Sequence, residues 1–299
     1  MPERPVIAVV GATGQQGGSV VDELVRRGRF RVRALTRRPD EYAGPADEAV
    51  AADLARPETL PAAFDGAYGA FAVTNFWEPG GIDEVAQGTA AVRAARAAGV
   101  EHFVWSTLPD VDRLSDGSLH VPHFTDKARV DDAVTEAGFG YWTFVEAPFY
   151  YQNLAGILGP QTMDDGSKAW VLPIDPEARQ IHMGDVTELG TVVAGVFEHP
   201  DKVGAGTRCA LAGGRYSFRD IVTTLNEQGH RMAFQRVPEQ VFNGFFPGAQ
   251  EMSAMLAYFE QFSYFGPDAD SKLEAARSVA TASPTPFEAW AQEHMPPTP

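Results

Sequence analysis

A glycine-rich segment directly after a short apolar run is the feature that most constrains how this chain folds. Val6–Val10 is continuously apolar, as buried parallel strands are, and it leads into Gly11-Ala-Thr-Gly-Gln-Gln-Gly-Gly18. Gly11 permits a tight turn out of the strand, and Gly14 lets the backbone approach a pyrophosphate. Gly17 lets the following helix pack closely on the sheet, and the free N–H groups at that helix's N-terminus attract phosphate. The segment therefore predicts a dinucleotide-binding turn between a strand and a helix.

Strand-like and helical patterns alternate through the first half of the chain. The expected strands after Val6–Val10 are Phe30–Thr36, Ala49–Ala52, Tyr68–Thr74, His102–Ser106 and Tyr141–Val145, and the expected helices are Ser19–Arg27, Ile82–Ala98 and His123–Ala137. This alternation predicts βαβ units and a parallel sheet with helices on both faces. The expected fold class is therefore α/β: a Rossmann-type, doubly wound parallel sheet with a smaller, interleaved C-terminal α+β domain.

The pattern changes after residue 150, where glycine, proline and aromatic residues become frequent. The elements expected there are a helix over Asp185–Phe197 with Asp185 as its N-cap, a last strand over Arg208–Ala212, and helices over Tyr216–Gln228, Pro238–Phe245 and Ala249–Phe262. We expect residues 1–150 to form a dinucleotide-binding Rossmann domain that is completed by about residues 181–212. Residues 151–180 and 213–299 are expected to form a smaller domain that covers the cofactor cleft. Its core is expected to contain Tyr258, Phe259, Phe262, Tyr264 and Phe265, with the wall of a substrate pocket as the alternative.

The charge of the chain limits its partners. With 24 basic and 40 acidic residues the formal net charge is −16, so the chain repels a phosphate backbone and no direct binding of nucleic acid is expected. Any regulatory role would then act through a protein partner. Because no apolar run reaches the roughly 20 residues that span a bilayer, and no signal-peptide pattern opens the chain, no membrane association is expected.

The counts of cysteine and histidine limit the chemistry. The single cysteine, Cys209, excludes an internal disulfide, favours a cytoplasmic location and is expected to be a small buried residue in a strand. His102, His120 and His182 have no partners at metal-ligand spacing, so no metal site is expected.

The expected end of the second strand, Thr36-Arg37-Arg38, bears on the choice of dinucleotide. NAD-selective sites usually place a carboxylate here to hold the ribose 2′-hydroxyl, and the chain has no acid at these positions. A guanidinium suits a 2′-phosphate through charge-assisted bonds, so NADP(H) is expected over NAD(H), which the site could also take. The alternative is that both arginines are solvated surface charges. Asp53 is expected either near the adenine or as the cap of its own turn.

Ligands of such sheets bind beyond the carboxyl ends of the strands, and this rule gives the candidate cofactor residues. They are Gly11, Thr13, Gly14, Gln15, Gln16, Gly17, Thr36, Arg37, Arg38, Asp53, Leu54, Thr74, Asn75 and Phe76. The hydroxyl of Thr13 can add a hydrogen-bond donor to the phosphate turn.

Further motifs give the chain a resemblance to a known family. They are Gly11-Ala-Thr-Gly-Gln-Gln-Gly-Gly-Ser-Val20, Thr74-Asn-Phe-Trp-Glu78, His123-Phe-Thr-Asp-Lys127, Phe149-Tyr-Tyr-Gln-Asn-Leu154, Phe246-Pro-Gly-Ala249 and Trp290-Ala-Gln-Glu-His294. By these motifs the chain resembles the NmrA-like branch of the atypical short-chain dehydrogenases/reductases, and particularly its HSCARG-like NADPH-sensor members. The resemblance implies a sheet of about seven strands with a small C-terminal domain. It also implies that Lys127 reaches the nicotinamide ribose and that Tyr150, Tyr151 and Asn153 line the nicotinamide end.

The candidate catalytic residues follow from a departure within that resemblance. Catalytic short-chain dehydrogenases carry Tyr-x-x-x-Lys on one face of a helix, with a serine on the neighbouring strand. Here His123 and Lys127 keep the spacing, Ser106 stands at the strand end, and histidine replaces the tyrosine.

Two functions follow from this departure. The resemblance favours a redox sensor that binds NADP(H) and acts through a protein partner, as a monomer or homodimer. The alternative is an NADPH-dependent reductase of a small quinone- or enone-like substrate, in which His123 donates a proton. A further interpretation leaves His123 and Lys127 on a solvated helix face and Ser106 as a strand-end hydroxyl.

Overall fold

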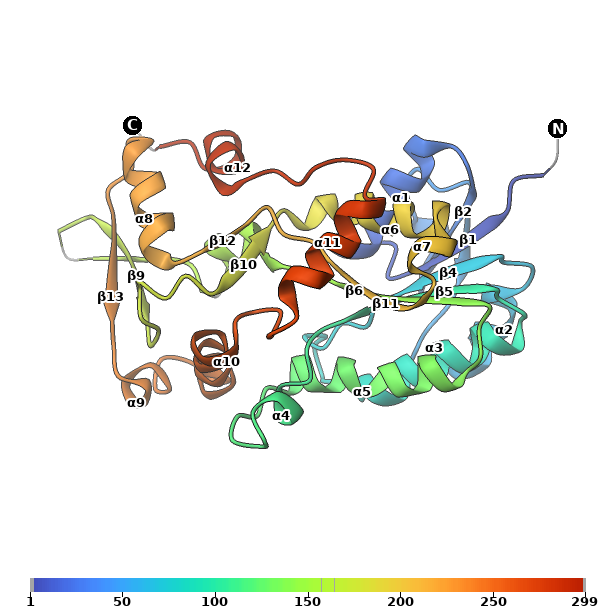
Figure 1. Ribbon diagram of the computed structural model, residues 1–299, viewed down its shortest axis with the longest axis horizontal. Helices are drawn as coiled ribbons and strands as arrows, with labels where there is room; N and C mark the ends of the chain where they lie inside the picture. The colour runs from blue at the N-terminus through green and yellow to red at the C-terminus, as the bar shows by residue number, and fades with distance from the viewer. Residues whose placement is uncertain (1–2, 157, 164, 298–299) are drawn as a thin grey trace.

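The largest element of the computed structural model is a seven-stranded parallel sheet with the order β11-β6-β5-β4-β1-β2-β3 (Figure 1). Its strands are β1 (Val6–Val10), β2 (Arg31–Thr36), β3 (Glu48–Ala51), β4 (Gly69–Ala72), β5 (His102–Thr107), β6 (Tyr141–Glu146) and β11 (Ala205–Ala210). This confirms the predicted α/β fold class and the number of strands in the sheet. The structure describes residues 3–156, 158–163 and 165–297; the predicted domain ranges also include residues 1–2, 157, 164 and 298–299, which lie outside the described residues.

Helices cover both faces of this sheet (Figure 1). On one face lie α1 (Gln15–Arg27), α6 (Leu189–Glu198) and α11 (Ala269–Val279), and on the other lie α2 (Leu60–Phe64), α3 (Glu84–Ala97) and α5 (Pro122–Glu136). Alternation along β1 explains the two cores between sheet and helices. Ile7 and Val9 pack with the first group of helices, and Ala8 and Val10 pack with the second.

A second group of elements lies beside the large sheet, and we refer to it as the second lobe (Figure 1). It contains one small sheet of β7 (Phe149–Tyr150), β10 (Ile181–Gly184) and β12 (Gly214–Tyr216), and another of β8 (Gln161–Thr162), β9 (Lys168–Leu172) and β13 (Met232–Arg236). Its helices are α8 (Phe218–Glu227), α9 (Glu239–Phe242), α10 (Ala249–Phe262) and α12 (Phe287–His294). The short helices α4 (Val111–Leu114) and α7 (Pro200–Val203) and the 3-10 turns Pro39–Glu41, Pro57–Thr59, Tyr151–Ala155 and Val186–Glu188 complete the described elements.

Aromatic side chains fill the core of the second lobe. Tyr258, Phe259, Tyr264 and Phe265 are buried there, and Phe262 stacks on Tyr258 with ring centroids 5.7 Å apart. This confirms their assignment to a core, and Tyr264 also lines the cavity described below. The division of the chain into two domains stays a prediction. Helix α11 lies in the range 213–299 that was predicted for the smaller domain. It nevertheless packs against the large sheet, where its residues Ala276 and Val279 are buried.

Several element boundaries differ from the sequence expectations. The helix expected over Tyr216–Gln228 is strand β12 followed by α8, because Ser217 caps the helix by accepting a 3.1 Å hydrogen bond from the Asp220 N–H. Asp185 is an N-cap as expected, but it caps a 3-10 turn that precedes α6. The helix expected over Pro238–Phe245 is reduced to α9. The sequence did not indicate strands β9, β10 and β13, whose pairing depends on distant segments, and it did not indicate helices α11 and α12.

Burial of the one cysteine is as expected, since Cys209 lies in β11 with no solvent exposure. In the described part of the chain, no helix combines the length and apolar character needed to cross a membrane.

Acid sensitivity is expected from His102, which begins β5. Its ring is fully buried between Tyr141 and Phe197, with ring centroids 5.7 Å and 5.0 Å away. Burial lowers the pKa of His102 to about 4, so the fold keeps it neutral, whereas the unfolded chain protonates it near its ordinary value of 6.5. Stability is therefore lost as the pH falls below that unfolded value.

We expect His102 to cost about 2 kcal/mol of unfolding free energy when the pH falls from about 7 to about 5. The variant His102→Phe removes the titrating group and should lose this part of the pH dependence. Urea unfolding of both proteins at the two pH values measures it. Equal pH dependence in the two proteins would contradict the assignment.

Candidate functional site

A cavity of about 970 Å³ lies at the carboxyl ends of the central strands and extends to the second lobe. Most of the predicted site residues line it: Gly11, Thr13, Gly14, Gln15, Gln16, Gly17, Thr36, Arg37, Asp53, Leu54, Thr74, Asn75, Phe76, Ser106, His123, Lys127, Tyr150 and Asn153. The structure thus brings the glycine-rich turn, the end of β2 and the three candidate catalytic residues to one cavity.

Two predicted cofactor residues are elsewhere. Tyr151 is fully buried in the core of the second lobe, where its ring packs on Phe287 and Trp290 and its hydroxyl donates to the Thr285 carbonyl at 3.2 Å. Tyr150 ends β7 and faces the cavity, whereas Tyr151 begins the 3-10 turn Tyr151–Ala155 and faces the core. Arg38 points to solvent and pairs with Glu41 at 2.8 Å. Neither side chain lines the cavity, so the structure separates these two residues from the other predicted site residues.

The glycine-rich turn has the shape that a pyrophosphate needs. Gly11 has a φ of 72°, and its carbonyl accepts a 2.9 Å hydrogen bond from the Gly14 N–H. A Cβ atom on residue 17 would lie 2.2 Å from the Gly11 carbonyl oxygen, so only glycine fits there. Gly14 is the N-cap of α1 and no side chain caps the helix, which leaves its first N–H groups free for an anion. The residues present therefore fit a dinucleotide phosphate.

The end of β2 holds an ion pair that sequence reasoning missed. The Arg37 guanidinium contacts the carboxylate of Glu78, which comes from the loop after β4, and both residues line the cavity. Glu78 is the last residue of the Thr74–Glu78 motif, and the sequence analysis assigns no function to its carboxylate. Asp53 lines the cavity too, but its carboxylate accepts from the Ala55 N–H and from Arg56, each at 3.0 Å. Asp53 is therefore the cap of its own turn.

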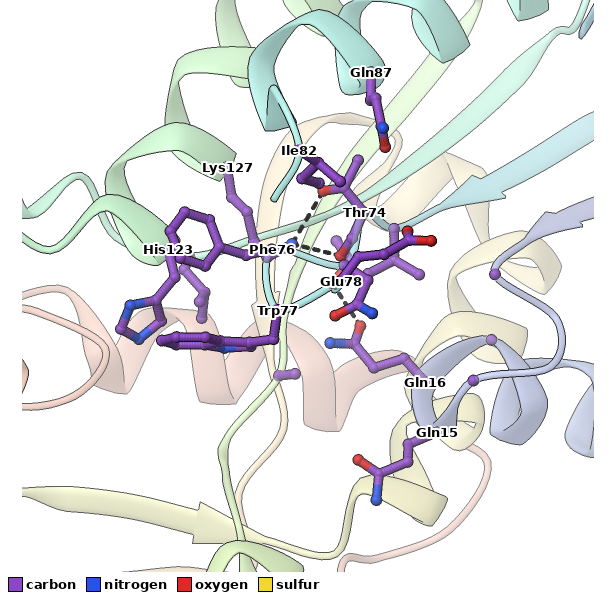
Figure 2. Close-up of a pocket in the computed structure, with 18 of the residues that line it drawn as sticks. Gln15, Gln16, Thr74, Phe76, Trp77, Glu78, Ile82, Gln87, His123 and Lys127 are labelled. Atoms are coloured by element: carbon purple, nitrogen blue, oxygen red, sulfur yellow. Dashed lines mark hydrogen bonds between the residues drawn. The ribbon is translucent and has the colours of Figure 1, made fainter. Parts of the chain in front are cut away.

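Lys127 is buried and fully engaged. Its ammonium donates to the Thr74 carbonyl at 2.8 Å, to the Thr74 hydroxyl at 3.1 Å and to Glu84 at 2.7 Å (Figure 2 shows the first two). Burial lowers the pKa of Lys127, and the carboxylate of Glu84 opposes that shift. Glu84 is 1% exposed, and no local sequence pattern indicates that it pairs with Lys127. Because an ammonium has three hydrogens, reaching a ribose requires Lys127 to give up one of these bonds.

Gln16 joins two other predicted site residues. The Ser106 hydroxyl donates to the Gln16 side-chain oxygen at 2.6 Å, and the Gln16 amide donates to the Tyr150 hydroxyl at 2.7 Å. Burial raises the pKa of Tyr150, while the bond from Gln16 acts in the opposite direction. Tyr150 therefore stays protonated near neutral pH.

His123 is held by a residue of the second lobe. Its ring Nδ1 lies 2.5 Å from a carboxylate oxygen of Glu251 on α10. Burial alone would raise the pKa of Glu251, but the hydrogen bond and charge of His123 lower it overall. The rings of Phe76 and Trp77 lie against the imidazole, with centroids 5.8 Å and 5.1 Å away (Figure 2). His123 is therefore a buried, oriented imidazole, which excludes the solvated helix face.

The cavity also has an apolar part of its wall. This part of the wall includes Phe246, Met252, Met255 and Tyr264, which all belong to the second lobe. Ser106, His123 and Lys127 share the cavity, but each bonds to a different partner. Among the described residues, no group of three or more His, Cys, Asp or Glu side chains could hold a metal ion.

A model of the NmrA-like family matches residues 3–291 of this chain. The NmrA-like family domain-containing oxidoreductase FrzB of Cladobotryum sp is 30% identical over 311 residues, covering 93% of this chain and 92% of that protein.

Solved structures show the same fold. The negative transcriptional regulator NmrA, solved in complex with NADP and with NAD, is 24% identical with TM-scores of 0.81 and 0.82, covering 98% of this chain and 95% of that one. An NADPH-dependent quinone oxidoreductase of Escherichia coli, complexed with NADPH, is 17% identical with a TM-score of 0.76, covering 96% and 99% of the two chains.

Proposed function

This chain belongs to the NmrA-like family, and from that premise we propose that it binds NAD(P)(H) and reduces a small, largely apolar carbonyl or quinone-like substrate. The names of the Cladobotryum and Escherichia coli proteins, both oxidoreductases, support this proposal. It reverses the order of the two functions expected from the sequence, where the sensor came first.

The observation that carries the proposal is the continuation of the cavity beyond the glycine-rich turn. The turn fits the pyrophosphate of a dinucleotide, and Phe246, Met252 and Met255 give the same cavity an apolar wall that suits an apolar substrate. His123 and Tyr150 line the same cavity.

The chemistry assigned to this chain is the handling of one proton. When bound, NADPH supplies the hydride, that is, two electrons and one hydrogen, for an electron-poor carbon of the substrate. His123 supplies the proton that the substrate oxygen needs, so the overall change adds two hydrogens to the substrate. Glu251 accepts from Nδ1 and fixes the ring, which leaves Nε2 for the substrate. The Tyr150 hydroxyl, held by Gln16, can donate a hydrogen bond to the same oxygen.

Turnover of NADPH with quinones, enones and aldehydes tests the proposal. We expect at least one of them to consume the absorbance of reduced nicotinamide, and His123→Ala to lower kcat by about 100-fold or more. His120→Ala is the matched control, because His120 is exposed, pairs with Asp112 at 3.1 Å and lies outside the cavity. If the purified protein binds NADPH tightly but oxidises it with none of the substrates, the reductase proposal fails.

That outcome would favour the second candidate, a redox sensor that acts through a protein partner. Lys127 donates all three of its hydrogen bonds within the protein, and Ser106 is bonded to Gln16. Such engaged side chains suit a site that binds a cofactor without turning it over. A sensor must bind reduced and oxidised dinucleotide with different affinities, so calorimetric titration with both forms tests this candidate.

A further inference from the structure

The sequence already predicts that Arg37, at the end of β2, binds the 2′-phosphate of NADP(H). We propose that Glu78 is the second residue that reads the 2′ position of the adenosine ribose: it accepts a hydrogen bond from the 2′-hydroxyl of NAD(H) and opposes the 2′-phosphate. This inference rests on the proposed binding of a dinucleotide and adds the side chains that select between NADP(H) and NAD(H). It assigns to Glu78 the place that an acid at the end of β2 takes in NAD-selective sites.

The contact between the two side chains is the first observation. Arg37 follows β2, and Glu78 reaches it from the loop after β4. Both line the cavity, with 63% of the Arg37 side chain and 27% of the Glu78 side chain exposed. A cation and an anion are therefore presented to the same part of a ligand.

The position of Glu78 is fixed by its own loop. The Glu78 N–H donates to the Asn75 carbonyl at 3.1 Å, and the Glu78 carbonyl accepts from the Gly81 N–H at 3.0 Å. At the start of the loop, Lys127 donates to the Thr74 carbonyl and hydroxyl. The carboxylate is therefore held beside Arg37 by the fold as well as by its attraction to the guanidinium.

The neighbouring charges do not compete for this role. Of the described charged side chains at this end of the cavity, Asp53 is bonded within its own turn. Arg38 pairs with Glu41 and does not line the cavity. Arg37 and Glu78 remain as the two charges that face a ribose.

The pair has opposite effects on the two cofactors. A 2′-phosphate forms charge-assisted bonds with Arg37 but is repelled by the carboxylate of Glu78. A 2′-hydroxyl donates to that carboxylate and leaves the ion pair intact. The protein therefore accepts both dinucleotides, and the balance between Arg37 and Glu78 sets the ratio of their dissociation constants.

Calorimetric titration with NADP⁺ and NAD⁺ tests this assignment without requiring turnover. We expect Glu78→Gln to shift the ratio of the two dissociation constants about tenfold toward NADP⁺, since it removes the repulsive charge. Arg37→Gln should shift the ratio about tenfold to 100-fold toward NAD⁺. Glu41→Gln is the control, because Glu41 pairs with the neighbouring Arg38 outside the cavity, and should leave the ratio unchanged.

The outcomes separate this inference from the proposed function. If the wild-type protein binds dinucleotide and Glu78→Gln changes both dissociation constants equally or not at all, the inference is wrong and dinucleotide binding stands. If the folded wild-type protein binds neither dinucleotide, both fail.

Discussion

Replacing Gly17 with alanine is expected to raise the dissociation constant for a dinucleotide by about 100-fold or more. The new Cβ atom would lie 2.2 Å from the carbonyl oxygen and 2.5 Å from the carbonyl carbon of Gly11. Both are backbone atoms, which cannot rotate away as a side chain can. Relief of the clash must move either α1 or the turn, and the free N–H groups that face the pyrophosphate move with it. Calorimetric titration with NADP⁺ and NAD⁺ measures the loss.

The neighbouring glycine supplies a matched control. A Cβ atom on residue 18 would lie 3.7 Å from the Ala12 carbonyl oxygen, which is ordinary van der Waals contact. Alanine also favours a helix over glycine by about 1 kcal/mol, so Gly18→Ala should keep its affinity and melt at the same or a higher temperature. Unchanged affinity in a folded Gly17→Ala protein would mean that the pyrophosphate binds elsewhere.

The cofactor turn could be predicted from the sequence alone. The features that define it are local: an apolar strand, glycines at fixed spacing and a helical pattern within a few residues of one another. The strands and helices of the large sheet were predictable for the same reason, since each depends on the periodicity of its own residues.

The acidic partners could not be found in this way. Glu78, Glu84 and Glu251 lie 41, 43 and 128 positions from the side chains they contact. Acids are common on any protein surface, and nothing in the local pattern distinguishes these three. No acid stands among Thr36, Arg37 and Arg38 at the end of β2, whereas the fold brings Glu78 there from the loop after β4. Long-range pairing is what the sequence alone does not reveal.

Adjacent residues of similar chemistry could not be told apart for a different reason. Tyr150 and Tyr151 are adjacent aromatic residues in one motif, and the change of backbone from strand β7 to a 3-10 turn between them decides which one faces the cavity. Arg37 and Arg38 are likewise adjacent, and of the two only Arg37 lines the cavity. Composition and motif place such a pair near the site but do not choose between its members.

The second large effect is expected at the buried pair of Lys127 and Glu84. Their side chains are 9% and 0% exposed and lie 2.7 Å apart. Glu84→Gln leaves the ammonium in the interior without its counter-charge, which typically costs about 3–5 kcal/mol of unfolding free energy. Lys127→Met leaves the Glu84 carboxylate buried, with the Thr74 hydroxyl as its remaining donor, and should cost a similar amount. Urea unfolding at neutral pH measures both.

A double variant and a pH series distinguish the loss of charge from a general packing defect. Lys127→Met combined with Glu84→Gln leaves no charge to bury, so it should cost clearly less than the sum of the single variants. Burial already lowers the pKa of Lys127, and without Glu84 nothing opposes that shift. The unfolded chain then holds the lysine proton at a pH where the folded Glu84→Gln variant has lost it, so its stability must rise with pH relative to the wild type. A packing defect would cost the same at every pH, and strictly additive costs in the double variant would show that the two charges do not interact.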